Sequence, residues 1–403
     1  MFSSTLLKRT AVRLVCLAIP IILILVASHS VLQSSKSFQL YGTDHKTRTT
    51  SPYAHSRPGS KGSEGILLVS CLFPLSKAKH SADDYAYWMS NFLGKVKTDI
   101  YFYTTPGMAS TIARLRGDLP IIINTTFSSP YDIPPLLGLE DHYEEMHRKD
   151  RERKIHSPEL YAVWNGKAYY LDEALKNSVN EYEYVFWTDA GSFRREHFYE
   201  DWPDYDRVEE LWEEGSKMSG MRKEDLFFIP TAEAPGTSHR YWEENMGPVD
   251  TDFTEGSFFG GRVEAIEWFR KVFYAYHDHY LSLGMFVGKD QTVFNSIMLL
   301  YPSRIITVWL TDPHAPAHKG LYRSVDAGML GDCGNPWFYY QFFLAEVSTR
   351  GKMREFWKAE REYTWDWWEQ RQTCRLTRLL TMKDLLGRRY GYRYIPPGPT
   401  LRL

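Results

Sequence analysis

Cysteine is scarce in this sequence, and its scarcity excludes one class of fold. The 403 residues contain only four cysteines, Cys16, Cys71, Cys333 and Cys374. A small secreted scaffold built on disulfides carries cysteine at a much higher density. Because Cys16 lies in an apolar run near the amino terminus, the other three cysteines can form at most one disulfide, which leaves one thiol over.

Net charge is nearly absent as well. The chain has 48 Lys and Arg against 50 Asp and Glu, which gives a formal net charge of −2. Sequence-independent binding to phosphate backbones needs an excess of basic residues, so we expect no nucleic-acid partner. The charged stretch at 142–154 mixes acids with bases and is typical of a solvated helix or a loop. Aromatic residues make up 15% of the chain and suit either apolar packing or stacking against sugars and bases.

One long apolar run predicts a membrane segment. Residues 14–27 carry no charge, and the apolar character extends weakly to Leu32. Lys8, Arg9 and Arg13 precede the run, and basic residues mark the cytoplasmic side of a membrane segment. The rest of the chain is therefore expected on the other side of the membrane.

These features predict a single-pass type II membrane protein. We expect a cytoplasmic tail at 1–13, a signal-anchor helix at 14–32 and a flexible stem, rich in Ser, Thr, Gly and Pro, at 33–64. The length of the run also fits a cleaved signal peptide. Both alternatives place the remaining chain on the lumenal side of the Golgi or the ER.

The globular part alternates strand-like and helix-like segments. Strand-like runs at 65–73, 100–103 and 120–123 are separated by helical spacing at 82–96 and 108–115, which is a βαβαβ pattern. The alternation continues, with helices expected at 161–179, 208–218, 263–283 and 291–300, and strands at 182–188, 226–229 and 305–310.

The alternation predicts one large α/β domain over 65–335, with a mostly parallel central sheet flanked by helices. An aromatic-rich extension over 336–403, with helices around 356–380, is expected to pack on it.

An aromatic strand over 182–188 ends in a single acid, Asp189. Ligands of open α/β sheets bind at the carboxyl ends of strands, and a carboxylate there can hold Mg²⁺ or Mn²⁺ against a diphosphate. Gly191 allows close approach of the backbone. A helix cap or a turn explains Asp189 equally well. Literal Asp-x-Asp strings at 204–206 and 250–252 follow no apolar strand, so Asp189 is the preferred metal ligand.

Three further segments contain candidate site residues. The glycines of Phe258-Phe259-Gly260-Gly261 either border an anionic or hydroxyl-rich ligand or only shape a strand-to-helix turn. Asp290 either caps the helix at 291–300 or accepts a proton from a sugar hydroxyl. On a Pro-restrained loop, His318 and Lys319 are either ordinary loop residues or a metal ligand and a phosphate neutraliser.

Several of these motifs together resemble the HtrL/YibB (WlaTC/HtrL-like) family of glycosyltransferases, which are taken to be GT-A-like. The likeness covers roughly 65–322. It rests on five motifs in this order: Ser157-Pro158-Glu159-Leu160-Tyr161, Trp164-Asn165-x-Lys167, Trp187-x-Asp189-Ala190-Gly191-x-x-Arg194, Phe258-Phe259-Gly260-Gly261 and Asp290-Gln291.

The resemblance implies transfer of a sugar from a nucleotide sugar, held with Mn²⁺ or Mg²⁺, to the hydroxyl of a glycan, glycoprotein or glycolipid. It implies that Asp189 and His318 bind the metal and that Asp290 is the catalytic carboxylate of the cleft. The residues implied to bind the nucleotide or substrate are Lys167, Gly191, Arg194, Gly260, Gly261, Gln291 and Lys319.

The sequence departs from the family at one point that bears on function. It has Asp189-Ala190-Gly191 where the usual motif has two acids, which weakens the expected metal dependence. The departure favours an alternative function, that of a non-catalytic lumenal carbohydrate-binding or scaffold protein on a degenerate transferase fold. A hydrolase is a third alternative, and the sequence has no Gly-x-Ser-x-Gly elbow that would favour it.

Overall fold

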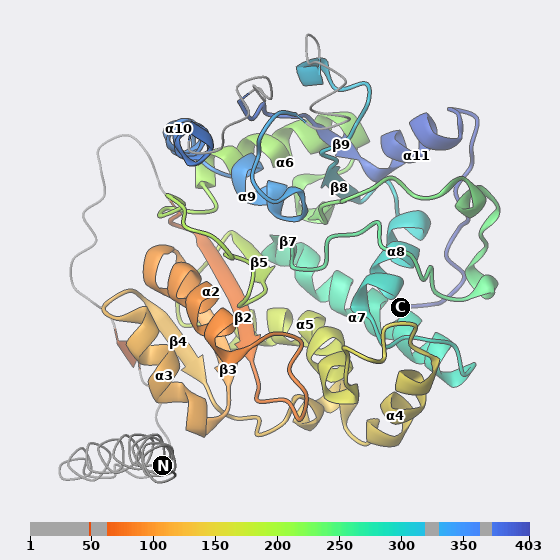
Figure 1. Cartoon of the computed structure of the whole chain (residues 1–403). Helices are drawn as coiled ribbons and strands as arrows, with labels where there is room; N and C mark the ends of the chain where they lie inside the picture. The colour runs from red at the N-terminus through yellow and green to blue at the C-terminus, as the bar shows by residue number, and fades with distance from the viewer. Residues whose placement is uncertain (1–47, 50–62, 319–329, 363–372) are drawn as a thin grey trace, which may run out of the picture. The chain divides into compact units, whose positions relative to one another are not determined.

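The computed structural model describes residues 48–49, 63–318, 330–362 and 373–403 (Figure 1). The predicted tail and anchor, almost all of the stem, and Lys319 lie outside these residues. No helix within the described ranges is long and apolar enough to cross a membrane.

The described residues form a mixed α/β fold around one nine-stranded sheet, with the strand order β1-β4-β3-β2-β5-β7-β6-β8-β9. The strands are β1 (Arg48–Thr49), β2 (Ile66–Leu72), β3 (Asp99–Thr104), β4 (Ile121–Asn124), β5 (Tyr184–Thr188), β6 (Phe227–Phe228), β7 (Phe258–Arg262), β8 (Ile305–Val308) and β9 (Leu379–Thr381). The α-helices are α2 (Ala82–Lys95), α3 (Pro106–Arg116), α4 (Glu140–Lys149), α5 (Pro158–Asn177), α6 (Tyr205–Ser219), α7 (Val263–Ser282), α8 (Asp290–Leu300), α9 (Tyr339–Phe343), α10 (Val347–Glu362) and α11 (Met382–Tyr390).

The sheet is mixed rather than mostly parallel, which corrects the expectation from the sequence. The pairs β2·β3, β3·β4, β2·β5 and β6·β8 are parallel, as βαβ units require. The pairs β1·β4, β5·β7, β6·β7 and β8·β9 are antiparallel. The difference arises largely because β7 enters the sheet between β5 and β6 from a long loop, without a crossover helix.

Gly260 and Gly261 belong to strand β7 and allow it to fit there. A Cβ at Gly260 would lie 2.1 Å from the carbonyl oxygen of Val185 on β5. A Cβ at Gly261 would lie 2.8 Å from the carbonyl oxygen of Leu226, just before β6. The glycines therefore serve close packing of β7 between its neighbouring strands rather than a strand-to-helix turn.

The two faces of the sheet carry separate apolar cores, because side chains alternate along each strand. On β2, Leu67 packs into the core that α5, α7 and α8 cover. The neighbouring Leu68 packs into the core on the other face, which α2, α6 and α9 cover. The alternating apolar strands predicted from the sequence are present at the expected positions.

The carboxyl-terminal segment completes the sheet instead of forming only helices. Helix α10 begins earlier than the expected range of 356–380, and Leu379–Thr381 forms the buried strand β9 beside β8. A short apolar segment does not show by its own pattern whether it pairs with an edge strand. A disulfide joins Cys333 to Cys374, and Cys71 is free and buried, as the count of cysteines allowed.

Candidate active site

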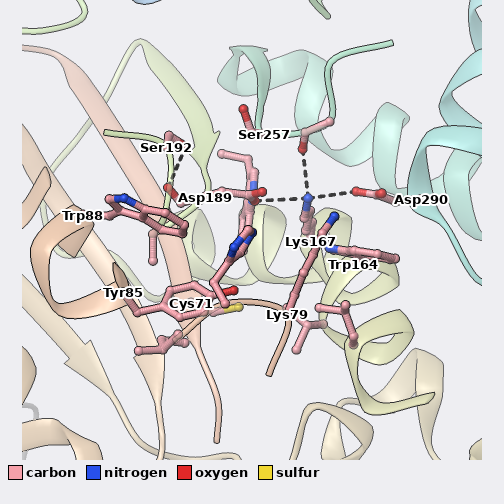
Figure 2. A pocket seen from close by; sticks show the side chains of 18 of the residues that line it. Cys71, Lys79, Tyr85, Trp88, Trp164, Lys167, Asp189, Ser192, Ser257 and Asp290 are labelled. Atoms are coloured by element: carbon pink, nitrogen blue, oxygen red, sulfur yellow. Dashed lines mark hydrogen bonds and ion pairs between the residues drawn. The ribbon is translucent and has the colours of Figure 1, made fainter. Parts of the chain in front are cut away.

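A cavity of about 220 Å³ opens where β2 and β5 end (Figure 2). Its lining comes from the end of β2 and the loop after it, from α2, α5 and the turn after β5, and from the segments that lead into β7 and α8. Ends of parallel strands meet at one edge of a sheet, and loops there are free to hold a ligand. Segments separated by more than two hundred residues therefore share one pocket.

Lys167 stands at the centre of the polar groups. It projects from α5, is only 2% exposed, and donates to the carbonyl oxygen of Gly256 over 2.9 Å. Its Nζ lies 3.1 Å from Oδ1 of Asp189 and 3.0 Å from Oδ2 of Asp290. The three protons of the ammonium group thus face three acceptors. Burial alone would lower the pKa of Lys167, but the two carboxylates raise it above its ordinary value, so the side chain is charged.

Asp189 occupies the turn directly after β5, and one third of its side chain is exposed to the cavity. Its Oδ1 accepts a hydrogen bond from Nε1 of Trp187 over 2.6 Å. Its backbone amide donates to the carbonyl oxygen of Ser257, and its own carbonyl accepts from Ser192. Asp189 is therefore part of a turn, and its carboxylate also faces the cavity.

Asp290 begins α8 and is 2% exposed. Burial raises its pKa to about 6, although the neighbouring Lys167 opposes this shift. Its Oδ1 accepts a hydrogen bond from the backbone amide of Gln291. The carboxylate is ionised at neutral pH and can accept a proton, which is the property of a general base.

Glu255 is a site residue that the sequence did not single out. It lines the cavity, is 1% exposed, and accepts a hydrogen bond from the backbone amide of Ser257 over 2.8 Å. Its Oε2 has no partner among the described residues. Burial raises the pKa of Glu255 well above its ordinary value, which favours the neutral form, and a neutral carboxyl can donate a hydrogen bond. The only local signal was an acid before the glycine at 256.

Aromatic rings and the basic side chains of Lys79 and Arg194 complete the pocket. Tyr85 and Trp88 lie on one side and Trp164 on the other, with Asp189 between them (Figure 2). The guanidinium of Arg194 lies 4.4 Å from the ring centre of Trp88. It also lies 5.2 Å from the ring centre of Phe338, and its Nε donates to the carbonyl oxygen of Gly191. A guanidinium this close to a ring is attracted to the negative face of the aromatic system.

The structure brings most of the predicted site residues together. Those that line the cavity are Lys167, Asp189, Gly191, Arg194, Asp290 and Gln291. Gly260 and Gly261 do not line it, because they are buried in the sheet. His318 ends a short 3-10 helix, Pro316–His318, and does not line it either. A Cβ at Gly191 would lie 3.1 Å from the ring of Trp88, so a larger residue there would need a small shift of that ring.

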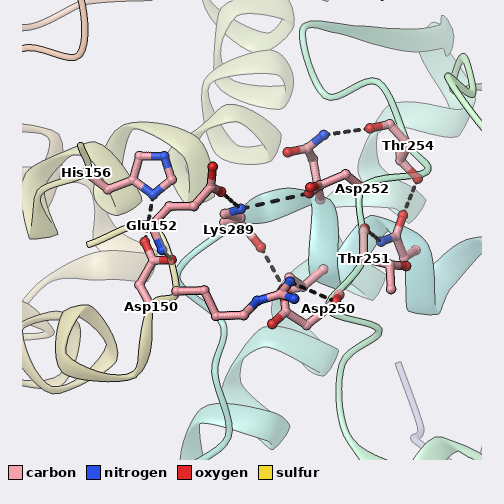
Figure 3. Close-up of polar contacts among 12 residues, drawn as sticks. Asp150, Glu152, His156, Asp250, Thr251, Asp252, Thr254 and Lys289 are labelled. Carbon is pink, nitrogen blue, oxygen red and sulfur yellow. Dashed lines mark hydrogen bonds and ion pairs between the residues drawn. The ribbon is translucent and has the colours of Figure 1, made fainter. Parts of the chain in front are cut away.

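A second cluster of charged groups lies where the segment between α4 and α5 meets the segments that lead into β7 and α8 (Figure 3). The potential ligand atoms of Asp150, Glu152 and His156 lie within 4.8 Å of one another, so these residues are a candidate metal triad. However, Nδ1 of His156 is 2.6 Å from Oδ2 of Asp150, and the ammonium of Lys289 bonds to Glu152. Three of the triad's atoms, Nδ1 of His156, Oδ2 of Asp150 and Oε2 of Glu152, are thus already engaged, whereas the buried Nε2 of His156 has no hydrogen-bond partner among the described residues.

The residues around Asp189 do not fit a divalent ion held by the protein. Oδ1 of Asp189 already receives donors from Lys167 and Trp187, and Lys167 lies between the two carboxylates that would have to share the ion. Among the described residues, no three potential ligand atoms cluster in this pocket. The literal Asp-x-Asp strings at 204–206 and 250–252 do not line the cavity. Asp204 instead caps α6 by accepting a hydrogen bond from the backbone amide of Arg207.

The fold and the pocket define a mixed α/β protein whose strand-end cavity combines acids, bases and aromatic rings. No family model matches the chain, and no curated protein matches it. The resemblance to the HtrL/YibB family therefore stays a prediction.

Solved structures with a related arrangement are glycosyltransferases by name, and their similarity is weak. Core-mannan synthase A (CmsA/Ktr4) from Aspergillus fumigatus, in an Mn/GDP form, gives a TM-score of 0.38 at 13% identity over 68% of this chain and 80% of that chain. Mouse xyloside xylosyltransferase 1 gives 0.34 at 11% over 60% and 84%. The mannosyltransferase Ktr4p from S. cerevisiae gives 0.37 at 11% over 67% and 73%. TM-scores this low carry no argument about the function of this protein.

Proposed function

We propose that this protein is a GT-A-like glycosyltransferase that moves a sugar from a nucleoside diphosphate to a hydroxyl acceptor. The observation that carries the proposal is the strand-end pocket, in which Asp189 and Asp290 flank the buried Lys167 between two aromatic walls. Aromatic faces stack on nucleobases and sugar rings. Basic side chains at the rim can stabilise the charge that develops on a leaving diphosphate.

The chemistry assigns a step to each kind of group. The acceptor oxygen bonds to the anomeric carbon while the bond from that carbon to the diphosphate oxygen breaks, and the diphosphate leaves with the electron pair. Asp290 takes the hydroxyl proton, since a base with a pKa of about 6 is ionised yet basic enough at neutral pH. Lys79 and Arg194 line the cavity and face the departing negative charge.

The stereochemistry of the product distinguishes two roles for Asp290. Direct displacement with Asp290 as base inverts the anomeric centre. If Asp290 instead lies under the opposite face of the sugar and only supports it, the anomeric configuration is retained. The anomeric configuration of the product, measured by NMR, decides between them.

A carbohydrate-binding protein on a degenerate transferase fold is the second candidate. Lys167 favours it, because an ammonium with three acceptors locks both acids in an ion-paired arrangement that suits a rigid binding site. Such a protein would bind sugars through Trp88 and Trp164 without any need for a nucleotide. Nucleotide binding therefore separates the two candidates.

We also propose that the protein is membrane-anchored through 14–32 and works on the lumenal side of the Golgi or ER, on a glycan, glycoprotein or glycolipid acceptor. The bond between Cys333 and Cys374 supports this location, since structural disulfides persist in oxidising compartments. Protection of the carboxyl-terminal part from protease in intact microsomes tests it. Digestion without added detergent would contradict a lumenal location.

The decisive experiment measures nucleotide binding by the full-length protein in detergent micelles. Thermal stability is recorded with a panel of nucleoside diphosphates, and released nucleoside diphosphate is then measured with the matching donor sugar and a set of acceptors. We expect one nucleotide to raise the melting temperature and the Arg194→Gln variant to lose this response. The exposed Asp252→Asn variant is the matched control and should respond as wild type does. Indifference to every nucleotide would contradict a transferase.

A further inference from the structure

We infer that the pocket binds the donor diphosphate without a divalent cation, with Lys167 as the built-in positive charge among the acids and Lys79 and Arg194 as the phosphate contacts. This inference rests on the proposed function. It departs from the metal site that the sequence suggested at Asp189 and His318.

Lys167 already lies in the place between Asp189 and Asp290 that a divalent ion would take. A cation that joins a strand-end acid to a diphosphate must contact the acid directly. At Asp189 the nearest positive charge is already the ammonium of Lys167, 3.1 Å from Oδ1, and the same ammonium is 3.0 Å from Asp290. The second expected ligand, His318, does not line the cavity. A divalent ion shared between the two acids would have to displace a buried lysine that a carbonyl oxygen and two carboxylates surround.

The second step concerns charge. Asp189, Asp290 and Lys167 together carry one negative charge, and burial favours the neutral form of Glu255 because it raises the pKa of that carboxyl well above its ordinary value. Lys79 and Arg194 add two positive charges at the cavity lining. A diphosphate therefore meets a net positive pocket without any ion. Were Lys167 a neutral residue, the same lining would carry no excess positive charge, and a divalent ion would then be needed to offset the two acids.

The third step concerns the contacts to phosphate. Among the described residues, no carboxylate forms an ion pair with Lys79 or Arg194, so their charges are available. Arg194 lies beside the rings of Trp88 and Phe338, and only its Nε is committed, to the carbonyl oxygen of Gly191. Its remaining N–H groups form the planar fork that matches two phosphate oxygens. Lys79 supplies a more mobile point charge from the loop after β2.

The test compares nucleotide affinity of the full-length protein in chelator and in Mn²⁺ by calorimetry, with the nucleoside diphosphate that gives the largest thermal shift. We expect the two dissociation constants to agree within about threefold, whereas a required ion changes them by more than about tenfold. Lys79→Gln and Arg194→Gln should each weaken binding by about tenfold or more, because each removes a charge-assisted contact. Asp252→Asn should leave it unchanged.

A charge-balanced double variant tests the role of Lys167 itself. Lys167→Met alone leaves two acids unpaired and can fail to fold, so it is combined with Asp290→Asn, which removes one acid along with the lysine. Asp189 is then free of the ammonium. We expect this double variant to bind the nucleotide weakly in chelator and to regain at least about tenfold in Mn²⁺. Should it not fold, the wild-type comparison alone decides.

Each outcome has one meaning. Equal wild-type affinity in both conditions, with loss in the Arg194 variant, supports the inference. Wild-type binding that requires Mn²⁺ overturns the inference and leaves the proposed transferase intact. Absence of binding by every nucleoside diphosphate in both conditions overturns the transferase, and the inference with it.

Discussion

Two clusters in this protein each place a lysine among acids, and their surroundings differ. In the pocket cluster, Lys167 is buried between Asp189 and Asp290 at the ends of the sheet strands. In the second cluster, Lys289 pairs with Glu152, whose side chain is 45% exposed, and lies 3.8 Å from Asp252, which is 61% exposed. Lys289 and Asp290 are neighbours in sequence, so one chain segment supplies both clusters (Figures 2 and 3).

The difference shows that acid spacing alone does not make a site. The second cluster contains a literal Asp-x-Asp string and a possible metal triad, yet none of these residues lines the cavity. The pocket cluster has no such string, but it combines a cavity with aromatic walls and a base whose pKa burial raises to about 6. Burial changes what a carboxylate can do, because it penalises the charged form.

The largest expected effect is on catalysis in the pocket cluster. Asp290→Asn keeps the size of the side chain but cannot accept a proton, so we expect the turnover number to fall by about 10² to 10⁴. Asp150→Asn in the second cluster should leave turnover within about threefold of wild type after correction for the folded fraction. Steady-state kinetics with saturating donor measures both. Equal losses in the two variants would remove the distinction between the clusters.

The next effect is on stability. Lys167→Met removes the cation that the buried Asp290 and the partly exposed Asp189 share, and we expect a loss of about 3–5 kcal/mol in the free energy of unfolding. Lys289→Met breaks pairs with partly exposed acids and should cost about 1 kcal/mol. Urea denaturation followed by tryptophan fluorescence gives both values. A larger loss at Lys289 would reverse the order of the two clusters.

The pH dependence of turnover sharpens the comparison. Asp290 must be ionised to act as base, so activity should rise with pH through about 6, falling roughly tenfold per unit below that value and levelling above it. The conservative Asp290→Glu variant, if active, should shift this limb rather than abolish it. A profile that stays flat from mildly acidic to neutral pH would contradict the role of Asp290.

The stability that His156 contributes in the second cluster should depend on pH. Burial lowers the pKa of His156 despite its bond to Asp150, so the unfolded chain binds a proton more readily than the folded protein. The contribution of neutral His156 to the free energy of unfolding is therefore complete above the ordinary histidine pKa of about 6.5. This contribution is lost as the pH falls below that value. Comparing the melting temperature of wild type and His156→Gln from pH 8 to pH 5 should show a difference that narrows toward acid. A pH-independent difference would exclude this titration.

The smallest expected effect is at the exposed end of the second cluster. Asp252→Asn removes a mostly exposed charge 3.8 Å from Lys289, and we expect it to change stability by less than about 0.5 kcal/mol. Nucleotide binding should also match wild type. A clear loss of nucleotide binding in this variant would move the functional site toward the Asp-x-Asp string.

Much of the local structure and part of the site could be predicted from sequence. The period of apolar residues reports which face of a segment is buried, so helices such as α2 and α7 were found close to their observed bounds. An acid at the end of an aromatic strand indicated Asp189, and the opening of a helix indicated Asp290. Glu255 could not be recognised, because the raised pKa of its carboxyl depends on burial by segments far away in the chain.

The sequence by itself determined the alternation of strands and helices, the number of cysteines available for a disulfide and the separate residues of the site. Only the tertiary structure decided that β7 and β9 run antiparallel to their neighbours and that Lys167 lies between Asp189 and Asp290. The reason is physical. Local patterns record whether a side chain will be buried, but the direction of a strand and the partner of a charge depend on which distant segments meet when the sheet assembles.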